Sequence, residues 1–145
     1  MTDFYVEVGD SVRFTKTVGE SDIYGFAGIT GDFAPVHVDE EYMKRSSYGG
    51  RIAHGVLMMG FMSTTSSLLL QKIMRDDWAE TAVSLGYDRV RFLNPVRIGD
   101  TVRVEYTVSE VDPVRRRSRS DIEVTNQNGE VVAVAQHIMK WVANA

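Results

Sequence analysis

The sequence predicts an α+β fold in which a curved antiparallel sheet wraps around one long central helix. Three features support this prediction. Residues 54–74, a segment of helix length, are apolar or small on almost every side, and about four strand-like segments follow them. Helices that precede a run of strands along the chain are typical of α+β proteins. The length of 145 residues suits one domain, which we expect to span residues 1–145.

The first part of the chain contains one strand and two shorter helical segments. Residues 10–18 alternate apolar and polar side chains, which predicts a strand. Apolar residues at helical spacing predict a helix that begins near Asp22 and stops at Gly31. A short polar segment over residues 38–50, which ends in paired glycines, predicts one or two further helical turns.

The central segment from His54 to Met74 lacks the polar face of an amphipathic surface helix. Its charges lie only at the C-terminal end. We therefore expect this helix to be buried on most sides. Gly60, Ser63 and neighbouring small residues would let other backbone approach it closely.

The second half of the chain is rich in strands. Residues 80–96 and 99–111 carry alternating apolar side chains. Residues 116–142 predict two further strands joined at Asn128-Gly129, a dipeptide that favours tight hairpin turns. A strongly curved antiparallel sheet around a buried helix is the hot-dog architecture, which is therefore the predicted fold.

The composition argues against several classes of protein. The chain has no cysteine, which excludes disulfides, thiolate metal sites and a thiol nucleophile, and which suits the cytoplasm, where we expect the protein to be. The N-terminus lacks the basic start and apolar run of a secretory signal, and no apolar stretch approaches the ~20 residues of a membrane span. The formal net charge of −4 argues against nucleic-acid binding. We expect neither a nucleic acid nor a membrane as partner.

An acid and a base lie five positions apart in the stretch GDFAPVH, which ends at His37. On one continuous helix, Asp32 and His37 would point to different faces. Pro35 prevents such a helix, because it lacks an amide hydrogen and pushes Ala34 towards an extended conformation. A turn between them can bring both side chains to one water molecule for general acid–base catalysis. The pair alone also fits a structural role, with a turn aspartate and a partly buried histidine.

The start of the long helix is a second candidate site. The first N–H groups of a helix have no partner within it, so they favour an anion or an oxygen that gains negative charge. Gly55 has no Cβ and permits close approach of a ligand there. His54 has a strong claim to an ordinary role as a cap or core residue. Ser63, about two turns further along a nearby face, is either a polar point in an apolar tunnel or a small packing residue.

A run of arginines interrupts the otherwise acidic chain in the stretch VRRRSR, from Val114 to Arg119. One interpretation is a solvated strand or turn. The other is a phosphate contact, because guanidinium groups bind phosphate oxygens in a bidentate way. Arg51, near the start of the long helix, is a further basic candidate.

Three longer segments form a recognisable set: YGFAGITGDFAPVHVDEEY, GRIAHGVLMMGFMS and RFLNPVRIGDTVRVEYTV. Together they cover most of the chain, and the set resembles the MaoC-like (R)-specific enoyl-CoA hydratases, also called the hydratase 2 family. The first segment follows the family pattern of an aromatic residue, Thr-Gly-Asp, a short turn with proline, and then a hydrophobic residue and histidine. The last segment is shared more widely among hot-dog proteins and supports the fold more than the function.

The resemblance implies a hot-dog fold, usually as a homodimer or higher homo-oligomer, and an acyl-CoA thioester as substrate. It implies a lyase of fatty-acid metabolism that adds water reversibly to a trans-2-enoyl-CoA and gives an (R)-3-hydroxyacyl-CoA. Asp32 would activate water for attack at C3 and His37 would supply a proton at C2, although the two roles can be exchanged. The backbone N–H of Gly55 would bind the thioester oxygen. No cofactor and no metal are implied besides the coenzyme A of the substrate.

The resemblance also extends to a substrate pocket. Ser63 matches a pocket serine of the family, and Phe33 and Pro35 in the turn are further pocket candidates. The arginine run gains weight as a contact for the CoA phosphates, with three candidate residues: Arg115, Arg116 and Arg117.

One position departs from the family pattern. The usual turn has Gly-Asp-x-Asn-Pro, whereas here Ala34 replaces the asparagine, whose amide normally helps to fix the loop or its ligands. Because Asp32 and His37 remain, we expect the chemistry to survive with a different acyl preference. Two other functions fit the same fold: a hot-dog acyl-CoA thioesterase and a non-catalytic acyl-CoA-binding subunit.

Overall fold

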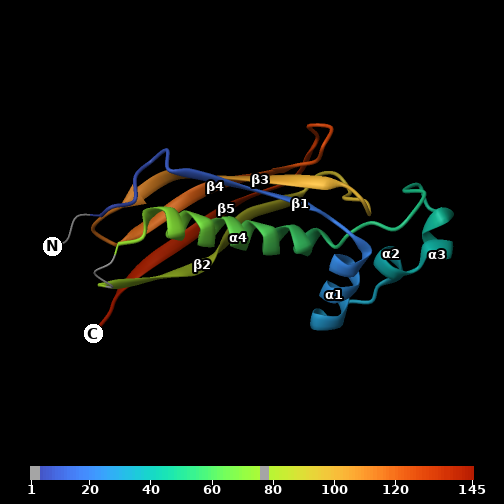
Figure 1. The fold of residues 1–145 in the computed structure, drawn as a ribbon, viewed down its shortest axis with the longest axis horizontal. Coiled ribbons are helices and arrows are strands. Elements are labelled where there is room, and N and C mark those ends of the chain that lie inside the picture. Colours follow the sequence, from blue (N-terminus) through green and yellow to red (C-terminus); the bar gives the residue numbers. More distant parts are fainter. Residues whose placement is uncertain (1–3, 76–78) are drawn as a thin grey trace.

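The computed structural model describes residues 4–75 and 79–145. It contains one five-stranded antiparallel sheet, a long helix along one face of the sheet, and three shorter helices beyond one end (Figure 1). This architecture confirms the predicted α+β class. In chain order the elements are β1 (Ser11–Thr17), α1 (Glu20–Thr30), α2 (Pro35–Val38), α3 (Glu40–Lys44), α4 (Gly55–Ile73), β2 (Glu80–Phe92), β3 (Thr101–Asp112), β4 (Arg117–Thr125) and β5 (Val131–Ala143).

The strands lie in the order β1-β3-β4-β5-β2, and each neighbouring pair is antiparallel. β4 and β5 form the predicted hairpin, in whose turn Gly129 has a φ of 77°, a value that suits glycine. The side chain of Asn126 closes this turn by accepting hydrogen bonds from the N–H groups of Asn128 and Glu130. β2 is an edge strand, so one of its sides has no partner strand within the described chain.

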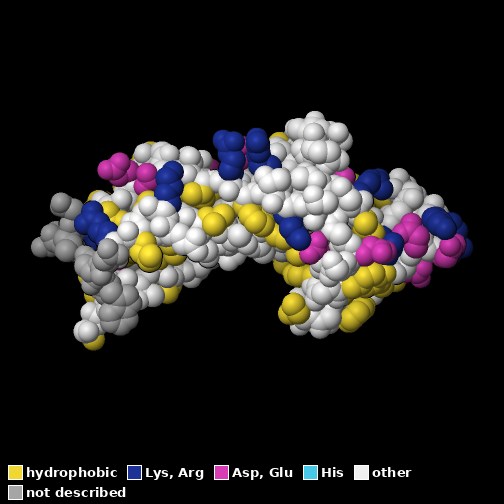
Figure 2. Space-filling view, viewed as in Figure 1, with side chains coloured by type: hydrophobic (Ala, Val, Ile, Leu, Met, Phe, Trp, Pro, Cys, Tyr) yellow, Lys and Arg dark blue, Asp and Glu magenta, His cyan; other side chains and the backbone are white. Residues whose placement is uncertain are grey.

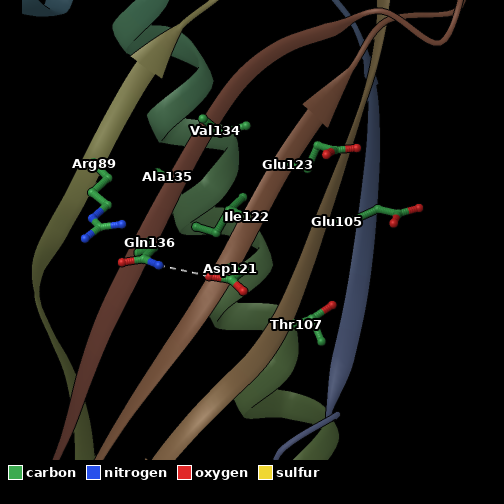
Figure 3. Close-up of a pocket in the computed structure, with 9 residues that line it drawn as sticks. All are labelled: Arg89, Glu105, Thr107, Asp121, Ile122, Glu123, Val134, Ala135 and Gln136. Atoms are coloured by element: carbon green, nitrogen blue, oxygen red, sulfur yellow. Dashed lines mark hydrogen bonds between the residues drawn. The ribbon is translucent and has the colours of Figure 1, made fainter.

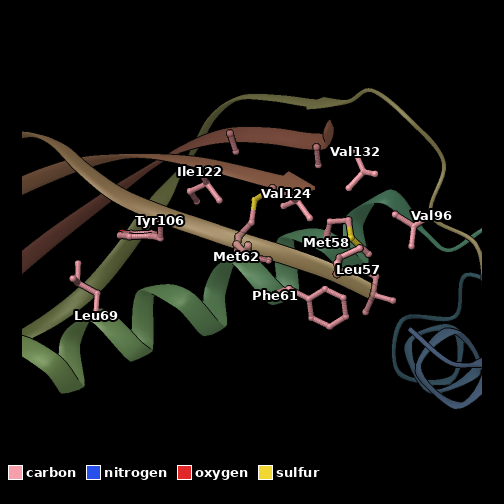
Figure 4. Close-up of a cluster of buried hydrophobic side chains, with 14 of the residues drawn as sticks. Leu57, Met58, Phe61, Met62, Leu69, Val96, Tyr106, Ile122, Val124 and Val132 are labelled. Carbon is pink, nitrogen blue, oxygen red and sulfur yellow. The ribbon is translucent and has the colours of Figure 1, made fainter. Parts of the chain in front are cut away.

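The core lies between the sheet and one face of α4 (Figure 4). Alternate residues of β3 and β4 point towards the helix, so Val104, Tyr106 and Val124 are fully buried. Met62 and Leu69 of α4 are fully buried on the opposite side of this layer. Burying one large apolar side chain stabilises a fold by about 1.5–3 kcal/mol. A shift of a strand by one residue would turn all of its buried side chains to solvent, so each strand keeps one face towards the helix.

α4 is buried along one face and exposed along the other, whereas the sequence predicts burial on most sides. Val56 is 52% exposed, and Gly60, Ser63 and Ser67 also lie on the exposed face. The prediction was wrong because the single sheet covers only one side of the helix. The exposed stripe consists mostly of small residues, which carry little apolar surface, so leaving it in water costs little.

The three short helices lie beyond the end of the sheet at which α4 begins (Figure 1). α1 ends at Gly31, whose φ of 83° confirms the predicted stop. The predicted turn lies at residues 31–34, and Pro35 then opens α2 as its first residue. Proline suits this position, because its fixed φ is helical and the N–H that it lacks would have no helical partner. The turn and α2 together place Asp32 and His37.

Arg51 ties these short helices together. Its guanidinium donates hydrogen bonds to Glu40 of α3, to Glu20 of α1 and to the hydroxyl of Tyr24. The bond to Glu40, followed by that to Glu20, raises the pKa of Arg51 above its ordinary value. Figure 2 shows charged side chains over α3 and apolar side chains over α1 at this end of the molecule. Arg51 is thus engaged with protein carboxylates.

Candidate active site

The turn between α1 and α2 presents Asp32 at the surface. The N–H of Asp32 donates to the hydroxyl of Thr30 at 3.2 Å, and its Oδ1 accepts the N–H of Ala34 at 3.3 Å. Hydrogen bonds of an aspartate to backbone two residues on are typical of Asx turns. They fix the backbone of the turn while the carboxylate stays exposed to solvent.

α2 carries His37, whose ring is half-buried. Its Nδ1 lies 2.8 Å from the carbonyl oxygen of Ile52. A carbonyl oxygen can only accept, so Nδ1 carries the hydrogen, and the neutral ring has its lone pair on Nε2. Nε2 is therefore the ring atom that can meet a water molecule or a substrate.

Asp32, His37 and His54 converge on one point. One side-chain ligand atom from each lies within 4.8 Å of the other two. In the described part of the chain, no direct hydrogen bond or ion pair joins Asp32 to His37. A gap of this size admits one water molecule with a hydrogen bond of about 2.8 Å to each group. The structure thus brings the acid and the base together, as the proline-containing turn predicts.

His54 is the last residue before α4 and is only 2% exposed. Its Nε2 lies 3.0 Å from the carbonyl oxygen of Asp32. Its ring stacks on that of His37, with centroids 3.7 Å apart, and contacts Phe26 of α1 at 4.6 Å. Its side chain makes no capping bond to the helix. His54 is thus a buried residue, as one of its two predicted roles has it, and it does not cap the helix. Its contact with Asp32 was not predicted, because the two residues are remote in sequence.

Gly55 is the first residue of α4 and lies against Phe92 of β2. A Cβ at position 55 would lie 2.8 Å from the Phe92 ring, closer than any real packing distance. Only glycine therefore fits without displacing the aromatic ring. As a first-turn residue, Gly55 presents an N–H that has no partner within the helix and is available to a ligand.

A cavity of about 240 Å³ opens beside His37 and Gly55. Met58, Val96 and Val132, all buried core residues, form part of its lining. A small, largely apolar cavity that contains a few polar groups is the usual form of a small-molecule site. The cavity adjoins His37, His54 and Gly55, whereas Asp32 is not among its lining residues.

The three predicted pocket residues lie outside this cavity. Phe33 is 57% exposed on the turn, and Pro35 is exposed at the start of α2. Ser63 lies on the exposed face of α4 and interacts with Tyr87 of β2. Burial raises the pKa of Tyr87, and Ser63 opposes that rise. Their assignment to a substrate pocket remains a prediction.

The arginine run lies at the β3–β4 turn, at the end of the sheet away from Gly55 (Figure 1). Arg116 pairs with Glu80 and lies over the ring of Phe4. Arg115 pairs weakly with Asp112 at 3.8 Å. Within one chain, the structure does not bring these arginines to the acid and the base, so their contact with CoA phosphates remains a prediction.

The convergence of Asp32, His37 and His54 also raises the question of a metal ion. The two imidazole rings are stacked with an interplanar angle of 27°, and Nδ1 of His37 is bound to the Ile52 carbonyl oxygen. Nε2 of His54 is already committed to a carbonyl oxygen. Tetrahedral metal sites need ligand lone pairs that point at one centre. The arrangement therefore fits hydrogen bonding better than metal coordination.

A second hollow, of about 430 Å³, lies on the sheet face that α4 leaves uncovered (Figure 3). Side chains of both charges line it, among them Arg89 of β2, Glu105 of β3 and Asp121 of β4. Mixed charges on an exposed strand face are typical of a solvated surface. None of the predicted site residues lies there.

Comparison with known proteins places this chain in a family. The MaoC like domain family matches residues 3–132, which is most of the chain. The chain belongs to the MaoC-like domain family. This finding confirms the resemblance inferred from the three sequence segments. No helix in the described part of this MaoC-like chain is long and apolar enough to cross a membrane.

Relatives of this MaoC-like chain include two named enzymes. The 3-hydroxybutyryl-CoA dehydratase of Methylorubrum extorquens is 39% identical over 114 residues, which are 79% of this chain and 68% of the relative. The (R)-specific enoyl-CoA hydratase of Rhodospirillum rubrum is 37% identical over 111 residues, 77% of this chain and 72% of the relative. Their names agree with the hydratase or dehydratase class expected from the sequence.

A solved structure of similar fold is the (R)-hydratase from A. caviae involved in PHA biosynthesis. It superposes with a TM-score of 0.80 at 25% sequence identity, covering 93% of this chain and 96% of that one. Together with a hot-dog-like protein from Thermanaerovibrio acidaminovorans, at a TM-score of 0.66, it confirms the predicted hot-dog fold.

Proposed function

We propose that this protein catalyses the reversible hydration of a trans-2-enoyl-CoA to an (R)-3-hydroxyacyl-CoA. The observation that carries the proposal is the convergence of Asp32 and His37, whose side-chain ligand atoms lie within 4.8 Å of each other while Nδ1 of His37 is held by the Ile52 carbonyl. The enzyme class and the stereochemistry are supported by the named relatives. Coenzyme A enters the proposed reaction as part of the substrate thioester, and the reaction needs no other cofactor.

The proposed reaction adds the two parts of one water molecule to the double bond. Asp32 takes a proton as the water oxygen bonds to C3, and His37 gives a proton to C2. Because Nδ1 of His37 is held by the carbonyl of Ile52, a proton can leave the ring only from Nε2, and only if the ring is charged beforehand. In the exchanged assignment, the neutral His37 accepts the water proton at Nε2 and a protonated Asp32 supplies C2.

The start of α4 would stabilise the negative charge that forms during the reaction. Attack at C3 moves electrons towards the thioester oxygen, and an N–H at a helix start can donate a hydrogen bond to it. Gly55 provides that donor, and the adjacent apolar cavity can hold the acyl chain. The CoA moiety would extend towards solvent.

A spectrophotometric hydration assay over a series of enoyl-CoA chain lengths, with chiral analysis of the product, tests the proposal. Removing a general acid or base lowers a rate by roughly 10²–10⁴-fold. We expect that loss in Asp32→Asn and in His37→Ala, each with a native circular dichroism spectrum. Full activity in both variants would sink the proposal.

A thioesterase is the second candidate function, and one contact favours it. The hydroxyl of Ser84 lies 2.7 Å from Nε2 of His137, as in a nucleophile and its base. However, burial lowers the pKa of His137 to about 4, which makes its ring a weak base. Release of free CoA thiol by the wild type, abolished in Ser84→Ala, would select the thioesterase. Binding of CoA esters without turnover would select a non-catalytic subunit.

The protein is proposed to act as a homodimer. β2 is an edge strand that leaves Val83 at 40% and Leu85 at 49% exposure. An unpaired edge with exposed apolar side chains favours pairing with another chain. Sedimentation equilibrium tests the assembly, and a monomer at micromolar concentration contradicts it.

A further inference from the structure

His54 contacts both members of the proposed catalytic pair. Its Nε2 lies 3.0 Å from the backbone carbonyl oxygen of Asp32, 22 residues away. Its ring stacks on the His37 ring at 3.7 Å, with an angle of 27° between the planes. The residue leads directly into Gly55, the proposed donor to the thioester oxygen. One buried side chain therefore touches or adjoins each group that the proposed reaction uses.

The surroundings of His54 define which nitrogen carries its hydrogen. The Asp32 carbonyl can only accept, so Nε2 is protonated. Nδ1 is buried and has no hydrogen-bond partner among the described residues. An additional N–H at that position would be a buried, unsatisfied donor, which is costly. The site therefore fits a neutral His54 ring. The His37 ring stacks on the face of this uncharged ring.

The ring of His54 has a second aromatic neighbour besides His37. Phe26 of α1 contacts it at a centroid distance of 4.6 Å and an angle of 54°. His54 thus lies between an aromatic ring of α1 and the imidazole of α2. With only 2% of its surface exposed, it has little freedom to rotate.

We propose that His54 is a positioning residue for the hydration reaction, an inference that rests on the proposed function. Its N–H fixes the backbone that carries the Asp32 carboxylate. Its ring fixes the plane of His37, whose Nδ1 is already bound to the Ile52 carbonyl. Together these contacts keep the carboxylate and Nε2 of His37 on two sides of one water molecule. Because a misplacement of about 1 Å can cost about 100-fold in rate, His54 matters to turnover through the placement of Asp32 and His37.

Three variants separate the two contacts. His54→Ala removes both, His54→Phe keeps a ring that can stack, and His54→Gln keeps an amide N–H near the position of Nε2. We expect kcat to fall about 100-fold in His54→Ala, with KM changed by less than about threefold. Phe and Gln should each recover part of the loss. A folded His54→Ala with wild-type kcat, or a loss confined to KM, overturns the proposal.

Nitrogen NMR of the imidazole rings provides a readout that needs no turnover. The chain has three histidines, so each ring is assigned by one substitution. We expect His37 in the Nδ1–H form and His54 in the Nε2–H form in the wild type. In His54→Ala the His37 ring loses its stacking partner and can turn away from the Ile52 carbonyl, so we expect a mixture of forms at His37. If that variant fails to fold, His54→Gln, which lacks the stacking ring, carries the same test. A single unchanged form at His37 overturns the positioning role.

The two proposals fail in different ways. A wild-type protein that hydrates no enoyl-CoA contradicts the proposed function, whereas the NMR result still decides whether His54 orients His37. An active wild type with an indifferent His54 contradicts only the positioning role.

Discussion

Nδ1 of His37 lies 2.8 Å from the carbonyl oxygen of Ile52, and this contact decides which ring nitrogen is available for chemistry. The carbonyl itself is well fixed, because the N–H of Ile52 donates to Val36 in α2 and Ile52 bridges to Arg97. Two hydrogen bonds therefore join α2 to the segment before α4, one through the backbone and one through the side chain of His37. Nε2 is therefore the nitrogen left for chemistry, in a ring whose ligand atom lies within 4.8 Å of the Asp32 carboxylate.

Replacing His37 by asparagine should separate the structural bond from the chemistry. The amide N–H of asparagine can replace Nδ1 against the Ile52 carbonyl, but the side chain has no atom at the position of Nε2. We expect His37→Asn to fold with nearly wild-type stability and to lose roughly 10²–10⁴-fold in kcat. Steady-state kinetics with crotonyl-CoA and urea denaturation measure the two effects.

His37→Ala is the matched comparison. It loses the bond to Ile52 as well as the ring, so it should be less stable than His37→Asn by about 0.5–1.5 kcal/mol. Retention of more than a tenth of wild-type kcat in His37→Asn would contradict a catalytic role for the ring.

The contact between Gly55 and Phe92 yields a second prediction. A methyl group at position 55 would lie 2.8 Å from the ring of Phe92. We expect Gly55→Ala to lose about 1–3 kcal/mol of stability through overpacking. We also expect kcat to fall by roughly tenfold or more, because the thioester oxygen loses its approach. Thermal denaturation and the hydration assay measure these effects.

Gly60 provides the control on the same helix. Outside the helix's own backbone, no atom of the described residues lies within 4 Å of a Cβ built there, and the residue is exposed. Gly60→Ala should therefore gain about 0.5–1 kcal/mol from helix propensity and keep its activity. Adding Phe92→Ala to Gly55→Ala should recover stability. Equal stability changes in the two glycine variants would show that the Phe92 contact is unimportant.

The fold was predictable from the sequence because its main determinants are local. Alternation of apolar residues marks the strands, and Asn128-Gly129 marks a hairpin within four residues of chain. The exposed face of α4 was not predictable in the same way. Its two faces differ in side-chain size, with Met62 buried and Ser63 exposed, rather than in charge, so a polarity pattern does not distinguish them.

The site was partly predictable for the same reason. Asp32 and His37 lie within one turn, and Pro35 between them limits how the chain can run. His54 reaches Asp32 across 22 residues, and Phe92 comes to Gly55 from a separate strand. Such contacts depend on how α1, α4 and β2 pack, and no local pattern in one sequence encodes that packing.

Arg51 should be a stabilising residue of the helical group that carries the site. Its side chain is only 14% exposed and bonds Glu20 and Glu40 on two different helices. Arg51→Gln leaves both carboxylates without this partner, so we expect a loss of about 1–3 kcal/mol. Lys44→Gln is the control, because the pair of Lys44 with Glu41 is exposed and should contribute less than about 0.5 kcal/mol. Urea denaturation that finds equal losses in the two variants contradicts the prediction.

His137 should make the stability of the protein depend on pH. It is fully buried between Tyr106 and Ser84, and burial lowers its pKa from 6.5 to about 4. Above pH 6.5 the ring is neutral in both folded and unfolded chains. As the pH falls below 6.5, the unfolded chain takes up a proton that the folded chain refuses, so the free energy of unfolding decreases. This group alone should remove about 1.6 kcal/mol between pH 6.5 and pH 5.

The contribution of His137 can be isolated by comparing the wild type with His137→Gln. Glutamine can still donate and accept hydrogen bonds between Tyr106 and Ser84, but it does not titrate. Urea denaturation at several pH values should therefore give a smaller pH slope for the variant, by up to about 1.4 kcal/mol per pH unit between pH 5 and pH 6. Carboxylates titrate in both proteins and cancel in the difference. Identical slopes would mean that His137 takes up its proton as readily in the folded chain as in the unfolded one, which would contradict the buried neutral ring.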